Sequence, residues 1–296
     1  MQQLADRIKP LVSGKARRRI VRARLGVRGL TGRLRSLPDF LIIGGMRCGT
    51  SSLYKYLAYH PAVAPPLRKE IHYLTVDFSK GETWYRSHFP TSARKRISGL
   101  VRGRPLQTFE ATPDYLFHPY AAERAARLVP EARLIAVLRD PVARAMSHYV
   151  HNVGWGKEPL PILEALLREP DRISEDLERL RGHPLDLCFD YRLYSYFARG
   201  IYVDQLRVWE RFYPRSRLLV VKSEDLYERP AEIYREILDF LELPPWQPDR
   251  FPNFDRRWGG DKPEVEIPDQ ARGWLAERFE PHNRRLYEWL GRDLGW

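Results

Sequence analysis

The sequence predicts a doubly wound α/β fold, in which helices cover both faces of a central parallel sheet. Four short apolar runs are bounded by turn-forming residues, and helical patterns lie between them. The runs are continuously apolar rather than alternating, which is typical of strands that are buried on both faces of a parallel sheet. The order of strand, loop, helix and strand favours crossover connections of this kind. A chain of 296 residues is long enough to bury such a core.

The first predicted strand is the run DFLIIGG, which leads directly into a glycine-bearing loop. The other three runs are rich in Leu, Ile and Val or in aromatic residues, as strands commonly are. Ligands of open α/β sheets bind at the carboxyl ends of the strands, so the loops that follow these runs are the first places to look for a site. The predicted strands are residues 39–45, 106–111, 133–140 and 217–225.

The predicted helices carry apolar residues at helical spacing. Two of them have a proline in the first turn, Pro141 and Pro230, where the missing N–H needs no partner. The predicted helices are residues 51–59, 120–129, 141–153, 202–213, 229–243, 268–279 and 283–291.

Two regions fit the alternating pattern less well. Residues 154–198 hold charged helical segments and a tyrosine-rich piece, and we interpret them as a helical insertion over the sheet. The tyrosines are expected in the core and the crevice wall rather than on a dedicated sugar platform. Residues 244–268 are rich in Pro, Trp, Arg and Gly and predict a long loop. Long irregular loops inside compact domains tend to be functional.

The positive charge of the chain is concentrated at its N-terminus. The formal net charge is +12, and residues 1–37 contribute +10 through eleven Lys and Arg against the single acid Asp6. The remaining domain, residues 38–296, is nearly neutral, which argues against a nucleic-acid partner for it. Two interpretations of the basic arm stay open. It is either a disordered solubilising extension or an amphipathic segment that lies on an anionic membrane or another polyanion.

The sequence indicates neither a disulfide framework nor a metal centre. Cys48 and Cys188 are the only cysteines, and no cluster of metal-ligating residues accompanies them. No apolar run has the length of a membrane span or the character of a signal peptide. We therefore expect a metal-free protein in a reducing compartment, the cytoplasm, at the inner face of the membrane if the arm binds lipid.

The loop after the first strand resembles a phosphate-binding loop without its lysine. Gly44 and Gly49 have the spacing of the Walker pattern G-x-x-x-x-G-K-[ST], and Ser51 has the hydroxyl position, but Thr50 replaces the lysine. A hydrolysable nucleoside triphosphate is therefore a poor candidate. Arg47 offers a cation from another position, and a guanidinium can bind two anionic oxygens at once. With the following helix N-terminus it predicts a metal-free anion site; the alternative is a plain capped turn.

A second anion site is predicted after the third strand. In the segment LRDPVARAMSHY, Arg139 stands at the carboxyl edge of the sheet, and Asp140 is the predicted cap of the next helix. Ser147 follows about two turns into that helix. Two separate phosphate-binding groups on one crevice indicate a nucleotide that is phosphorylated in two places.

Together these motifs resemble the sulfotransferases that use 3′-phosphoadenosine 5′-phosphosulfate (PAPS), above all the heparan sulfate N- and 3-O-sulfotransferases and bacterial proteins of that domain family. The resemblance runs from about Phe40 to Trp296. It implies a P-loop-NTPase-like fold of three layers. It also implies in-line transfer of a sulfuryl group to a hydroxyl or amine, with 3′-phosphoadenosine 5′-phosphate (PAP) as product. By analogy the acceptor is a saccharide or a glycolipid. The segments that carry it are HPAV, KEIHYL, EATPDYL, LRDPVARAMSHY, RGIYVDQLRVWERF, EDLYERP and FEPHNRRLYEWLGRDLGW.

The resemblance assigns a cofactor site. Arg139 and Ser147 match the residues that hold the 3′-phosphate in the family. Lys262, beside Gly259 and Gly260, matches loosely a loop that closes over the nucleotide. The residues that match the loop around the 5′-phosphosulfate are Arg47, Cys48, Gly49, Thr50, Ser51 and Ser52.

The resemblance also implies the catalytic groups. Glu70 in KEIHYL matches the general base of the heparan-type enzymes, and His72 matches a histidine beside it in the 3-O type. Arg47 is implied to stabilise charge on the leaving phosphate. From residue type alone, Glu70 is more readily a surface carboxylate paired with Lys69 or Arg68, and His72 is equally a packing residue.

Three positions depart from the family pattern. The loop cation of the family is usually Lys, and Arg47 differs from it in reach and geometry. Ala111 stands where some of those enzymes carry a substrate-contacting Lys, so acceptor recognition is expected to differ. Their disulfide near the C-terminus is absent here. Cys48 is also a candidate nucleophile beside a cation, but the sequence shows no base to activate it, and we interpret it as a small loop residue.

Two functions of other classes remain as alternatives. A P-loop-type small-molecule kinase needs the Walker lysine and a carboxylate for magnesium, and the lysine is absent. A non-catalytic binder of polyanions or membranes, acting through the basic arm, requires residues 1–37. The enzyme interpretation instead requires only the remaining domain for nucleotide binding. The identity of the acceptor and the oligomeric state stay open.

Overall fold

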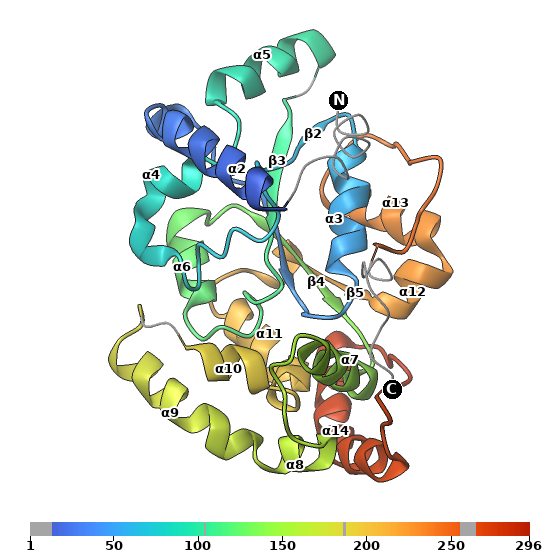
Figure 1. Cartoon of the computed structure of the whole chain (residues 1–296). Coiled ribbons are helices and arrows are strands. Elements are labelled where there is room, and N and C mark those ends of the chain that lie inside the picture. The colour runs from blue at the N-terminus through green and yellow to red at the C-terminus, as the bar shows by residue number, and fades with distance from the viewer. Residues whose placement is uncertain (1–13, 104, 186–187, 255–264) are drawn as a thin grey trace.

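The computed structural model describes residues 14–103, 105–185, 188–254 and 265–296 (Figure 1). Within these residues one parallel sheet has the strand order β2-β3-β1-β4-β5. All four predicted strands are confirmed. The additional strand, β2, has only two residues, too few to give a sequence pattern. The strands are β1 (Phe40–Gly44), β2 (Val63–Ala64), β3 (Gln107–Ala111), β4 (Arg133–Leu138) and β5 (Leu218–Lys222).

Helices cover both faces of the sheet, as a three-layer fold requires. Successive side chains of a strand point to opposite faces, so β1 contributes to two separate cores. Leu41 and Ile43 pack toward α6 (Ala121–Leu128) and α11 (Tyr202–Glu210). Phe40 and Ile42 pack toward α3 (Thr50–Tyr59) and α13 (Pro230–Phe240). The predicted three-layer α/β architecture is confirmed.

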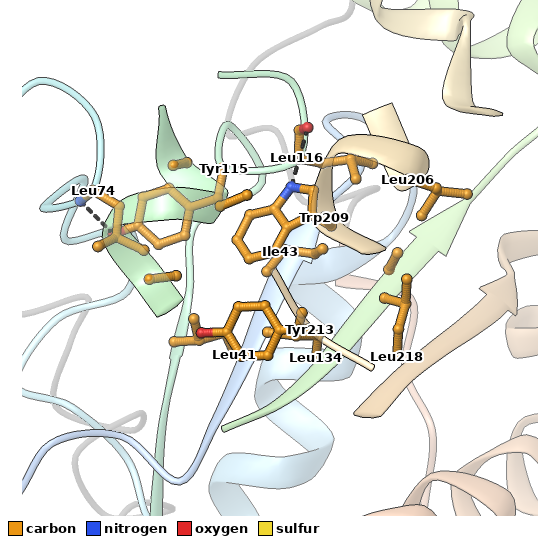
Figure 2. Close-up of a cluster of buried hydrophobic side chains, with 14 of the residues drawn as sticks. Leu41, Ile43, Leu74, Tyr115, Leu116, Leu134, Leu206, Trp209, Tyr213 and Leu218 are labelled. Carbon is orange, nitrogen blue, oxygen red and sulfur yellow. Dashed lines mark hydrogen bonds between the residues drawn. The ribbon is translucent and has the colours of Figure 1, made fainter. Parts of the chain in front are cut away.

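Figure 2 shows the first of these cores. Trp209 and Tyr213, which come from α11 and the turn after it, lie over Leu41 of β1 and Leu134 of β4. The indole nitrogen of Trp209 donates a hydrogen bond to the carbonyl oxygen of Leu116 at 3.4 Å, so its one polar group is satisfied. This core fixes the segment that follows β3 against α11.

The predicted helices are confirmed except at the C-terminus. The helices over residues 81–86, 92–102 and 223–228 were not predicted, and the last of these begins at Ser223 within the predicted strand 217–225. Residues 268–279 and 283–291 were expected as two helices, and this was wrong, because they form one helix with Pro281 inside it. Proline removes a single N–H bond there, while the buried side of the helix, including Leu275, Phe279 and Leu286, packs continuously. The remaining helices are α2 (Gly14–Gly29), α4 (Gly81–Arg86), α5 (Ser92–Arg102), α7 (Pro141–Gly154), α8 (Ile162–Leu167), α9 (Glu169–Gly182), α10 (Phe189–Tyr194), α12 (Ser223–Glu228) and α14 (Asp269–Leu290).

The segment predicted as an insertion holds α8, α9 and α10. Figure 1 shows α8 beside α14 and α9 beside α10, beyond the carboxyl ends of the strands rather than on a face of the sheet. An ionic contact explains the position. Asp114, just after β3, is buried and accepts hydrogen bonds from Arg192 at 2.8 Å and from Arg199 at 2.7 Å. Tyr191, Tyr196 and neighbouring aromatic side chains are buried, as expected for core tyrosines.

The basic arm is attached to the domain at its C-terminal end. Arg28 Nε donates to the carbonyl oxygen of Ser87 at 2.6 Å, and Arg35 Nη1 donates to that of Phe89 at 2.9 Å. Residues 14–29 of the arm form α2, and residues 1–13 lie outside the described part of the chain. No helix among the described residues is long and apolar enough to span a bilayer.

Asp114→Asn tests how strongly the ionic contact holds the insertion. Burial disfavours the charge of Asp114, but Arg199 and Arg192 outweigh burial and hold the pKa of this carboxyl well below its usual range. We expect the variant to lower the free energy of unfolding by about 3–5 kcal/mol, because Arg199 stays buried without its counter-charge. Urea denaturation measures the loss.

The pH dependence gives a second readout. A carboxyl whose pKa is lower in the folded than in the unfolded state stabilises the fold above about pH 4, and this stabilisation is lost as the pH falls. The acid-induced loss is therefore smaller in Asp114→Asn. Glu131→Gln, which removes an exposed partner of Arg217, is the control and costs less than about 1 kcal/mol. Equal losses in both variants contradict the assignment.

Candidate active site

The loop between β1 and α3 is held closely against β4 and Tyr227. The N–H of Gly45 donates to the carbonyl oxygen of Val137 in β4 at 2.6 Å. Gly49 has a φ of 94°, in the left-handed region that favours glycine. A Cβ at Gly49 would lie 2.8 Å from the hydroxyl of Tyr227, so a larger residue has no room there. Thr50 and Ser52 follow in the first turn of α3 and are buried.

Arg47 connects the two predicted anion sites. Its Nε donates a hydrogen bond to Ser147 Oγ at 3.1 Å, although the two residues are 100 positions apart. Arg47 also has a φ of 67°, which is rare for a residue with a side chain. The structure thus brings together the residues that the sequence predicts around two different phosphates.

Arg139 lies at the end of β4, as predicted, and α7 begins directly after it. Asp140 caps α7, since its Oδ1 accepts hydrogen bonds from the N–H groups of Val142 at 2.8 Å and Ala143 at 3.4 Å. The carbonyl oxygen of Arg139 accepts a hydrogen bond from the hydroxyl of Tyr202 at 2.9 Å. The side chains of Arg139 and Ser147 are both partly exposed and accessible to a ligand.

Lys69 is the residue that the sequence analysis missed. Its Nζ donates to Ser51 Oγ at 2.8 Å and to Glu70 Oε1 at 2.8 Å. The predicted pairing of Glu70 with Lys69 is therefore confirmed, but the lysine also contacts the phosphate-binding loop. The only sequence signal was its place beside Glu70, because the contact with Ser51 depends on how two separate loops meet.

Glu70 and His72 are held in place by the end of β3. The N–H of Glu70 donates to the carbonyl oxygen of Ala111 at 3.1 Å, and that of His72 donates to Thr112 Oγ1 at 3.4 Å. The φ angles of Glu70 and His72 are 57° and 60°. With Arg47 they are three of the four non-glycine residues with positive φ among those described. Strained backbone gathers at functional sites, so these angles favour a site here.

The buried carboxylate of Glu110 helps to hold the segment of Glu70 and His72 in place. It accepts hydrogen bonds from the hydroxyls of Tyr85 at 2.5 Å, Tyr115 at 2.6 Å and Thr112 at 2.7 Å. Burial raises the pKa of Glu110 despite these donors. Both acids of the motif EATPDY therefore stabilise the fold: Glu110 accepts hydrogen bonds from hydroxyl groups, and Asp114 pairs with arginines.

The ionisation of the candidate groups suits acid–base work. Burial opposes the charge of Glu70, but the neighbouring Lys69 outweighs it, so the pKa of Glu70 is lowered and the group is ionised at neutral pH. Burial lowers the pKa of His72, which is therefore neutral. Its Nε2 lies 3.9 Å from Glu70 Oε2. Burial raises the pKa of Cys48 to about 11, so its thiol is protonated and a poor nucleophile.

Two predictions remain, which concern Lys262 and the absence of a metal centre. Lys262, with Gly259 and Gly260, lies outside the described residues. The described part of the predicted long loop does contact the phosphate-binding loop, since the N–H of Phe254 donates to Ser52 Oγ at 3.0 Å. In the described ranges no group of three His, Cys, Asp or Glu side chains is arranged to hold a metal ion.

Comparison with known proteins identifies the family of this chain. The family model of the sulfotransferase domain matches residues 37–251. The chain therefore belongs to the sulfotransferase family. It is 30% identical over 307 residues to human heparan sulfate glucosamine 3-O-sulfotransferase 6, an alignment that covers 97% of this chain and 77% of the relative.

Two further relatives of this sulfotransferase are a membrane-associated sulfotransferase and a bacterial sulfotransferase of known structure. Membrane-associated sulfotransferase kil1 of Dictyostelium discoideum is 25% identical over 335 residues, which cover 90% of this chain and 68% of the relative. The crystal structure of a sulfotransferase from Alicyclobacillus acidocaldarius superposes with a TM-score of 0.63 at 28% identity, covering 88% of this chain and 98% of that chain. The fold of this sulfotransferase is thus shared with a bacterial member of the family.

Gly49→Ala tests the close approach inside the loop. We expect it to destabilise the sulfotransferase more than Gly291→Ala does. Both glycines have a left-handed backbone, where alanine costs about 1–2 kcal/mol, but Gly291 faces open space while Gly49 faces Tyr227. Urea unfolding of both variants measures the difference. Tyr227→Phe should recover part of the loss at Gly49, and equal losses at the two glycines contradict the argument.

Proposed function

We propose that this sulfotransferase moves the sulfuryl group of PAPS to a hydroxyl or amine of a saccharide or glycolipid. The observation that carries the proposal is the hydrogen bond between Arg47 and Ser147. It places a loop suited to one anionic group beside a helix suited to another. A nucleotide with separate 5′ and 3′ phosphates has anionic groups at two such places.

The loop and α3 are proposed to bind the 5′ end of PAPS. The N-terminus of α3 carries free N–H groups and the positive end of the helix dipole. Arg47 adds a guanidinium from the loop, and Ser51 and Ser52 add hydroxyls. The loop can turn tightly at Cys48 and Gly49, because the side chain of Cys48 is buried and Gly49 has no side chain. No metal is needed to neutralise the phosphosulfate in this arrangement.

Arg139 and Ser147 are proposed to bind the 3′-phosphate. Arg139 lies where β4 passes into α7 and Ser147 lies about two turns into α7, where its hydroxyl contacts Arg47. A phosphate there accepts hydrogen bonds from both side chains. The two ends of the nucleotide are then read by groups that contact one another, which favours PAPS over nucleotides without a 3′-phosphate.

Glu70 is proposed to be the general base. The acceptor oxygen or nitrogen forms a bond to sulfur while the bond from sulfur to the phosphate oxygen breaks, and the electron pair of that bond stays on the phosphate. The proton of the acceptor passes to the carboxylate of Glu70, which is ionised at neutral pH. Lys69 contacts both this carboxylate and Ser51 of the phosphate-binding loop. Its ammonium group can therefore stabilise negative charge that develops between the loop and Glu70 during the transfer. His72 is proposed to orient the acceptor beside Glu70.

Binding of PAP without acceptor tests the nucleotide site. Isothermal calorimetry in the presence of a chelator should show binding of PAP, and Arg139→Ala should weaken it by roughly a hundredfold, since a charge-assisted hydrogen bond is lost at a charged ligand. Arg211→Ala, on the exposed end of α11, is the matched control and leaves affinity unchanged. Binding of AMP with the same affinity contradicts the assignment of the 3′-phosphate.

Turnover tests the base and the lysine. The acceptor is first identified by mass spectrometry after incubation of cell extract with sulfur-labelled PAPS. Glu70→Gln is then expected to bind PAP normally and to lose about 10²–10⁴-fold in kcat. Full activity of this variant means that the proton passes to another group.

Lys69→Met separates the lysine from the base. Without its charge, burial dominates and the pKa of Glu70 rises. The acid limb of the profile of kcat/KM against pH is then expected to move to higher pH. Lys80→Met, which removes an exposed partner of Asp77, leaves the profile unchanged. An unshifted profile in Lys69→Met contradicts the proposed coupling.

A further inference from the structure

The outer side of α2 and of α5 exposes large aliphatic side chains. Six of the eleven exposed large hydrophobic residues in the described part of the chain belong to these helices and to the turn after α2. We call this surface the α2–α5 face. Its six aliphatic residues, between 52% and 88% exposed, are Ile20, Val27, Leu30, Leu34, Ile97 and Leu100.

The α2–α5 face is also strongly basic. Residues 14–38 and 92–106 contain no Asp or Glu. The arginines stand between the aliphatic residues along both segments, where a guanidinium can extend to one side while its stem lies on apolar surface. The exposed arginines of the face are Arg19, Arg24, Arg33, Arg94 and Arg96.

The segment after α2 is joined to the cap of α5, and both helices are attached to the domain. Arg35, after α2, forms an antiparallel bridge with Thr91, the residue that caps α5. Lys95 of α5 pairs with Asp39 at the start of β1. Figure 1 shows α2 and α5 at the same end of the molecule. The aliphatic and basic groups of the two helices therefore form one preformed surface rather than belonging to a free tail.

We propose that the α2–α5 face binds an anionic lipid bilayer. Aliphatic side chains flanked by arginines are the pattern of helices that lie in the membrane interface, with the apolar groups among the acyl chains and the cations at the phosphates. A nucleic acid gives no partner to six exposed aliphatic residues. The fixed position of α5 extends the surface beyond the arm, so the arm alone does not account for the binding.

The inner side of α2 lies over a cavity that reaches the segment next to the candidate active site. Val21, Leu25 and Gly29 line a cavity of about 770 Å³ together with Trp84 and Arg68 of the domain. Arg68 directly precedes Lys69 and Glu70 in the chain. A bilayer on the outer side of α2 is thus separated from the segment of the proposed base by one helix and this cavity.

Vesicle sedimentation of the full chain tests the proposal. The protein should pellet with vesicles of phosphatidylcholine and phosphatidylserine and stay in solution with vesicles of phosphatidylcholine alone. Sodium chloride at about 0.5 M should weaken the binding, because charge attraction is then screened within a few ångströms. Equal binding to both vesicle types, or no binding to either, overturns the proposal.

Two pairs of substitutions locate the surface. Ile97→Ser with Leu100→Ser, on α5 alone, and Arg24→Glu with Arg33→Glu, on the arm, are each expected to weaken vesicle binding by roughly tenfold or more. The matched controls are Leu167→Ser with Leu185→Ser and Arg181→Glu with Arg211→Glu, which are exposed elsewhere and leave binding unchanged.

Independent measurements separate other outcomes. Unfolding curves show whether each variant keeps the fold, and the vesicle assay needs neither PAPS nor an acceptor, so it does not depend on the proposed function. If binding survives both the α5 pair and the arginine pair, the face is not the membrane site. If the same pairs instead dissociate a dimer in sedimentation equilibrium and no vesicle binding occurs, the face joins two copies of the chain and the proposal is overturned.

Discussion

A parallel sheet brings the carboxyl ends of its strands to one edge, and the candidate active site consists of the residues that come first after those ends. Arg47 follows β1, Lys69 and Glu70 follow the short β2, Asp114 follows β3 and Arg139 follows β4. Residues that are separated by up to a hundred positions therefore meet, as the contact between Arg47 and Ser147 shows. No further device is needed to assemble the site.

The same constraint crowds charges into a small volume, and the surrounding contacts make this possible. Asp114 neutralises Arg192 of the insertion and Arg199, which directly follows the insertion. Among the described residues, the cations of the candidate site include Arg47, Arg139 and Lys69, and Glu70 is the anion that pairs with Lys69. Such an excess of positive charge disfavours the empty site and favours a ligand with several negative charges.

The sequence could predict what depends on local pattern. Long apolar runs predicted β1, β3, β4 and β5, whereas β2 has two residues and no periodicity to detect. Asp140 was predicted as a cap because the cap residue and its helix adjoin in the chain. The role of Lys69 was not predictable from spacing, because its contact with Ser51 joins two loops that only the sheet brings together. Pro281 misled the prediction at α14, since tertiary packing carried the helix across it.

The lysine that the Walker pattern lacks is replaced by two cations with different partners. Arg47 bonds to Ser147, on the side where we propose the 3′-phosphate, and its backbone is held in a left-handed conformation. Lys69 bonds to Ser51 and to Glu70, between the loop and the proposed base. Lys69 thus lies between the loop that we propose for the leaving phosphate and the carboxylate that we propose for the acceptor proton. We therefore infer that Arg47 serves mainly to bind the nucleotide. We infer further that Lys69, from the segment after β2, stabilises charge during transfer in place of the missing Walker lysine.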